Sequence, residues 1–137
     1  MRIRFNVEDG YVRVYRSSTG RCSPEHELQF LRSLSEICGQ SDRNNVLLIG
    51  SGPKTDLSAL DLLELGRAIS VSGLNIAAVC NRNIVDEDAE FLQDIVWNRG
   101  GAIRFFNDEQ PALEWLGVDL RHDIGNDLDP RREYSRT

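Results

Sequence analysis

Apolar and polar positions alternate along the chain in two distinct patterns. Two uninterrupted apolar runs, at residues 46–49 and 76–80, predict strands that are covered on both faces, as in the middle of a parallel sheet. Between them, Leu62, Leu65 and Ile69 recur at helical spacing and predict an amphipathic helix that starts near Ser58. The centre of the chain is therefore predicted to be a strand–helix–strand unit.

The same patterns assign the rest of the chain. The further predicted elements are a hairpin at residues 3–15 with an Asp-Gly turn, helices at 23–38, 86–99 and 109–116, and a strand at 102–106. Gly39 is predicted to end the first helix, and Arg104 indicates that the last strand is an edge or has one less covered face. The order ββαβαβαβα predicts an α/β domain, with a mixed sheet of about five strands packed with helices and parallel except for its first strand.

Regular patterning stops at Gly117. The 20 residues that follow, 118–137, are rich in charge and have no sustained apolar period, which predicts a flexible C-terminal tail. One domain at residues 1–117 plus this tail accounts for the 137 residues.

Charge and cysteine content narrow the function classes. The net charge of −6 argues against binding to duplex nucleic acid or to an anionic membrane surface. Cys22, Cys38 and Cys80 form an odd set without a CxxC pair, which favours reduced thiols in a cytoplasm. No catalytic constellation and no metal-ligand spacing is found, so we expect no catalytic residue, no metal and no cofactor.

Three short motifs carry a resemblance to a known family. They are Thr19-Gly20 followed by Ser23-Pro24-Glu25, the stretch Thr55-Asp56-Leu57-Ser58, and the close of the domain at residues 105–117, which contains ALEWLG. Together with the element order, they resemble the STAS domain of bacterial anti-sigma-factor antagonists, and most closely its SpoIIAA-like group. The resemblance implies a STAS-like fold over residues 1–117 and a regulatory role.

Ser58 has two interpretations. In the antagonists, a Ser just before the second helix is phosphorylated by a partner kinase, and the resemblance places Ser58 at that position. The usual Asp-Ser-(Ser/Thr)-Gly is here Leu57-Ser58-Ala59-Leu60, without the preceding acid and the following Gly. Asp61 stands three residues after Ser58, as in a capping box, so a helix cap is the favoured interpretation.

The loop before this helix is the candidate partner-binding or anion-binding site, because ligands of open α/β sheets collect at the carboxyl ends of strands. Its polar and small residues are Gly50, Ser51, Gly52, Lys54, Thr55 and Asp56. The loop matches neither the P-loop nor the GxGxxG pattern, and Pro53 removes a backbone N–H. A solvated turn is the simpler interpretation, although Lys54 lies beside a helix N-terminus.

The sequence thus predicts a cytoplasmic, non-enzymatic bacterial regulatory module. Its partner would be a protein, such as a kinase or an anti-sigma-like regulator, or a second copy of the chain. The alternative function is a sensor or carrier with a pocket at the strand carboxyl ends, for an apolar or anionic small molecule. An exposed apolar patch on the helix that starts at Ser58 would favour the interaction module.

Overall fold

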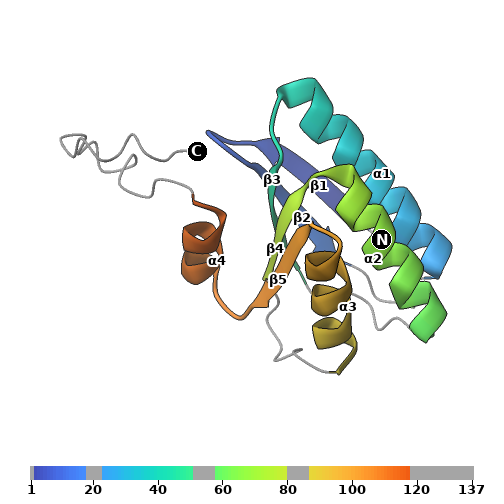
Figure 1. The fold of residues 1–137 in the computed structure, drawn as a ribbon. Coiled ribbons are helices and arrows are strands. Elements are labelled where there is room, and N and C mark those ends of the chain that lie inside the picture. Colours follow the sequence, from blue (N-terminus) through green and yellow to red (C-terminus); the bar gives the residue numbers. More distant parts are fainter. Residues whose placement is uncertain (1, 18–22, 51–57, 80–86, 118–137) are drawn as a thin grey trace.

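The computed structural model describes residues 2–17, 23–50, 58–79 and 87–117. Its elements follow the predicted order (Figure 1). They are β1 (Arg2–Val7), β2 (Val12–Ser17), α1 (Pro24–Ser41), β3 (Asn45–Ile49), α2 (Ala59–Ser72), β4 (Asn75–Val79), α3 (Glu87–Asn98), β5 (Ala102–Phe106) and α4 (Glu109–Leu116).

The strands form one five-stranded sheet in which the spatial order β1-β2-β3-β4-β5 equals the chain order. β1 pairs antiparallel with β2, and the other neighbours pair in parallel. The predicted α/β class and the adjacent central strands β3 and β4 are therefore confirmed. α1, α2 and α3 each connect two parallel strands of a sheet that grows in one direction. Because such crossovers are right-handed, all three helices lie on the same face of the sheet (Figure 1). α4 follows the last strand and lies on the other face.

Each face of the sheet has its own apolar core. The larger core joins Val12, Val14, Val46 and Ile76 of the strands to buried residues of α1, α2 and α3. The smaller one joins Leu47, Ala77 and Val79 to Ala112, Leu113 and Leu116 of α4. The alternation of Val46 and Leu47 between the two cores explains why β3 is apolar throughout.

Arg13 links α4 to the sheet by polar contacts as well. Its guanidinium donates hydrogen bonds to Glu109 Oε1 at 2.9 Å and to Tyr11 Oη at 3.0 Å. Burial acts to lower the pKa of Arg13, but these hydrogen bonds outweigh it and raise the pKa above its ordinary value. The first turn of α4 is thus fixed above β2 by a permanent cation.

One prediction concerned the end of α1 and another the exposure of β5. The prediction that Gly39 ends α1 is wrong, because the helix continues to Ser41 and reaches a left-handed residue only at Asp42, with φ of 58°. Ser41 Oγ donates to the Ile37 carbonyl at 2.7 Å, and the Asp42 N–H bonds back to the last turn, so the helix end is satisfied without glycine. Arg104 is exposed on the edge strand β5, as predicted.

Candidate functional site

The candidate site lies where α1 and α2 begin, beside each other at the carboxyl ends of the parallel strands. Each helix starts with a serine cap, because the His26 N–H donates to Ser23 Oγ at 3.2 Å and the Asp61 N–H donates to Ser58 Oγ at 3.1 Å. The two first turns line a common groove. The candidate surface therefore includes residues of α1 as well as residues of α2, the helix singled out from the sequence.

Ser58 has the geometry of a full capping box. Besides accepting from the Asp61 N–H, it donates its own backbone N–H to Asp61 Oδ2 at 3.1 Å. Two backbone N–H groups at the start of α2 are therefore satisfied reciprocally. Both side chains are accessible, since Ser58 is exposed and Asp61 is half-buried. Modification of Ser58 is not tested by this geometry and stays a hypothesis.

The other predicted site residues lie mostly outside the described part of the chain. These residues are Ser51, Gly52, Lys54, Thr55 and Asp56, so the predicted anion-binding loop stays a prediction. Cys80, at the carboxyl end of the predicted strand at residues 76–80, also lies outside it.

Gly50, the first residue of that loop, has a role in packing. Its φ is +152°, and a Cβ built on it would lie 1.7 Å from the backbone oxygen of Arg16. Its N–H donates to the Val79 carbonyl at 3.2 Å. Gly50 therefore lets β3 end tightly between β2 and β4, which explains the glycine without reference to a phosphate.

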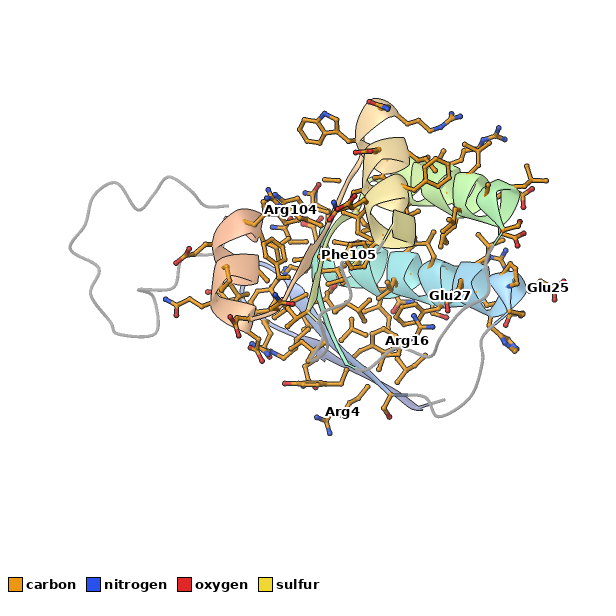
Figure 2. The ribbon with its side chains drawn as sticks, turned by 90° about the horizontal axis from the view of Figure 1, so that it is seen from below. Arg4, Arg16, Glu25, Glu27, Arg104 and Phe105 are labelled. Atoms are coloured by element: carbon orange, nitrogen blue, oxygen red, sulfur yellow. The ribbon has the colours of Figure 1, made fainter. Side chains whose placement is uncertain are left out.

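A buried ion pair joins α1 to the end of β2, next to Gly50, and was not predicted from the sequence. Arg16, at the end of β2, donates to Glu27 Oε1 at 3.2 Å and through its other terminal nitrogen to Oε2 (Figure 2). The guanidinium also lies 4.5 Å from the centre of the Phe30 ring. The available signal was the alternation Val12, Val14, Arg16, which points Arg16 to the same face as the two buried valines.

The groove between the helices is shallow and acidic. Pro24, Leu28 and Leu65 contribute apolar surface, and Glu27, Asp61 and Glu64 contribute carboxylates. Its volume of about 10 Å³ is at the lower limit of the space that one water molecule needs, so this groove does not enclose an organic ligand. It is better suited to contact with another surface than to the binding of a small molecule.

α2 also carries an exposed apolar side chain, Leu60, which does not line the groove. It lies in the first turn of α2 and is 66% exposed, whereas Leu62, two residues later, is buried. Val71 at the far end of α2 is 80% exposed and lies three turns along the same outer side. The exposed large apolar side chains on α2 are therefore two single residues at its opposite ends, and they do not form the continuous patch that would favour an interaction module.

Metal binding and membrane insertion both depend on which side chains gather together and on how long and apolar the helices are. Within residues 2–17, 23–50, 58–79 and 87–117, no three His, Cys, Asp or Glu side chains gather in a way that could hold a metal ion. The helices in these ranges are all too short or too polar to cross a bilayer.

Comparison with known proteins gives a structural relationship. Neither a family model nor a curated protein sequence matches the chain. Among solved structures, it is similar to an uncharacterised DUF3478 protein with a SpoIIAA-like fold from Shewanella loihica PV-4. The two share 19% sequence identity with a TM-score of 0.51, over 84% of this chain and 92% of the other. The chain therefore has a SpoIIAA-like fold, in agreement with the resemblance of its sequence.

Proposed function

We propose that this protein is a non-enzymatic regulatory module that binds a protein partner through the first turns of α1 and α2. The observation that carries the proposal is Leu60, which is 66% exposed in the first turn of α2, the helix that also contributes Asp61 and Glu64 to the acidic groove. An exposed apolar side chain favours contact with a partner, because its removal from water stabilises a complex. The SpoIIAA-like fold and the resemblance to bacterial anti-sigma-factor antagonists support a cytoplasmic signalling role.

The charge of the surface indicates the chemistry of the partner. Glu64 lines the groove and is exposed, Asp61 is half-buried in it, and Glu25 is exposed in the first turn of α1. Glu27 is already paired with Arg16 and contributes less free negative charge. We therefore expect a partner that presents an apolar side chain flanked by Lys or Arg, since complementary charge speeds association and favours the correct partner.

Ser58 gives this surface a means of control. A phosphate on its hydroxyl would be held close to the Asp61 carboxylate, and the two negative groups would repel each other. The same phosphate would strengthen the binding of a basic partner or weaken the binding of an acidic partner. Control by phosphorylation is thus part of the proposal, and the identity of the partner decides its sign.

The test uses two exposed apolar residues of the same helix as a matched pair. A photo-crosslinking amino acid is placed at position 60 or position 71 of the full chain, and the protein captured in the producing cells is identified and purified. We expect capture from position 60 and not from position 71.

The affinity of that purified protein is then measured for Leu60→Asp and Val71→Asp. Both changes add one negative charge at an exposed site of α2, but Asp suits the first turn of a helix and not the last, so the free energy of unfolding of each variant is measured beside its affinity. We expect Leu60→Asp to weaken binding at least tenfold and Val71→Asp to change it less than twofold. Equal effects of the two variants would overturn the proposal, as would loss of binding for Val71→Asp alone.

A further inference from the structure

The two edges of the sheet are protected to different degrees. At β5, the outward N–H of Phe105 donates to Gln93 Oε1 of α3 at 2.9 Å, and Arg104 places a charge on the strand. At β1, the described residues supply no corresponding hydrogen bond to the outer side of the strand. Open edges of this kind pair readily with other strands, and proteins usually block them.

The hairpin geometry identifies the backbone groups on the open side. The Glu8 N–H donates to the Tyr11 carbonyl at 2.8 Å, which makes these two residues a hydrogen-bonded pair. In an antiparallel ladder, hydrogen-bonded and non-bonded pairs alternate. From the register Val7↔Val12 and Asn6↔Arg13, the odd-numbered residues of β1 point their backbone groups outward. These residues are Ile3, Phe5 and Val7.

The same three residues form an apolar row. Ile3 is 37% exposed and Val7 is 52% exposed, while Phe5 is half-buried against the larger core. The open edge therefore combines free hydrogen-bonding groups with apolar side chains that remain in contact with water. Figure 2 places Arg4 at the edge of the molecule, turned away from α1, α2 and α3.

The sequence of β1 is complementary to itself in one antiparallel register. With Phe5 opposite Phe5 of a second copy, Ile3 faces Val7 and Arg4 faces Asn6 across the two-fold axis. All the outward backbone groups of the three odd-numbered residues then pair with one another. The alternative register centred on Arg4 places Arg4 opposite Arg4 of the second copy, and the two like charges repel each other. The alternative register centred on Asn6 places Ile3 opposite Asp9, so the apolar pair of Ile3 with Val7 is lost.

We propose that the protein forms a symmetric homodimer in which β1 pairs antiparallel with β1 of a second copy, centred on Phe5. The sheets of the two copies then become continuous, and the exposed apolar side chains of Ile3 and Val7 cover each other. This interface lies on β1 and does not involve the α2 surface of the proposed function. Failure of either proposal therefore leaves the other intact.

The first test is the mass in solution. The full chain of 15.5 kDa is studied by sedimentation over a range of concentrations, and its mean mass should rise toward that of two chains. Val7→Pro removes an outward N–H without removing a hydrogen bond to β2, so it should raise the dissociation constant at least tenfold. Val7→Ala keeps the N–H and should have a smaller effect. A mass that stays at one chain at all concentrations would overturn the proposal.

Hydrogen exchange tests the geometry without any substitution. The amides of Ile3, Phe5 and Val7 should become protected as the concentration rises, whereas those of Arg4 and Asn6 should be protected at every concentration by their bonds to β2. Concentration-independent exchange at all five amides, in a sample that dimerises, would place the interface elsewhere and refute the proposal.

Cysteine cross-linking tests the register. In a background in which Cys22 and Cys80 are replaced by serine, Arg4→Cys and Asn6→Cys chains are mixed and oxidised. Directly opposed non-bonded pairs have Cα atoms about 4.5 Å apart, within the range of a disulfide. The mixture should form a 4–6 disulfide, and each variant alone should remain uncrosslinked. Efficient 4–4 or 6–6 disulfides would show that the register is wrong.

Discussion

Replacement of Ser58 by alanine tests whether the capping box holds the start of α2. The change removes the acceptor of the Asp61 N–H and leaves that donor to water. Because the N-cap is exposed, the loss should be that of an ordinary cap, about 1 kcal/mol in the free energy of unfolding. For a domain of this size, 1 kcal/mol corresponds to a fall of about 4 °C in Tm.

The assay is urea unfolding followed by circular dichroism, with three comparison variants. Ser58→Asp should be nearly neutral, since aspartate also caps and suits the helix dipole. Ser58→Gly should lose only a few tenths of a kcal/mol. Ser33→Ala, at an exposed position inside α1, is the control and should be neutral or slightly stabilising because alanine favours helix.

A double-mutant cycle completes this experiment. Asp61→Ala removes the reciprocal bond from the Ser58 N–H. Since the two side chains act as one unit, the double variant should lose less stability than the sum of the single variants. If Ser58→Ala matched the control, or if the cycle showed no coupling, the capping box would not stabilise α2. A change in partner affinity of tenfold or more for Ser58→Asp, in either direction and with folding intact, would instead identify Ser58 as a switch.

Three further outcomes are expected. Gly50→Ala should lower the free energy of unfolding in urea by more than about 3 kcal/mol, because its Cβ would overlap the Arg16 carbonyl. Gly39→Ala is the control: its Cβ meets no atom within 4 Å inside α1, and it should stabilise the fold by about 1 kcal/mol. Equal effects of the two variants would contradict this. Burial raises the pKa of the Cys38 thiol, so its contribution to stability should be fully present below the ordinary thiol pKa of about 8.5 and should be lost as pH rises through the raised pKa. Unfolding at pH 7 to 10 should therefore show a steeper decline in stability for the native chain than for Cys38→Ala. Removal of residues 123–137 should change Tm little, because they carry too little apolar surface to offset their ordering entropy; a clear fall in Tm would show that this segment docks.

The sequence identified the elements whose signals are local. The apolar runs of β3 and β4, the Ser58 cap and the glycine at position 117 were sufficient, because each reflects the geometry of a few neighbouring residues. Gly39 misled the prediction because glycine also tolerates a helix interior when the helix end is satisfied by other groups.

Features that depend on packing between elements were harder to predict from the sequence. The pairing of Arg16 with Glu27 joins a strand to the following helix, and no spacing rule specifies it. The exposure of Leu60 follows from how α2 is rotated against the sheet, whereas its sequence shows only a broad apolar stripe. Handedness does not fix the face of α4, because no strand follows it, but central strands that are apolar on both faces require a cover on the side that the three crossover helices leave open.

The coincidence of strand order with chain order bears on how the protein folds during its synthesis. Each new strand can dock on the one made just before it, so no early segment has to wait for a distant partner in the sheet. The face beneath α4 is an exception, because its cover is made after all five strands. A growing chain that has reached Phe106 would present Leu47, Ala77 and Val79 to the ribosome surface and to chaperones. Completion of the last helix would then mark the end of that vulnerable interval.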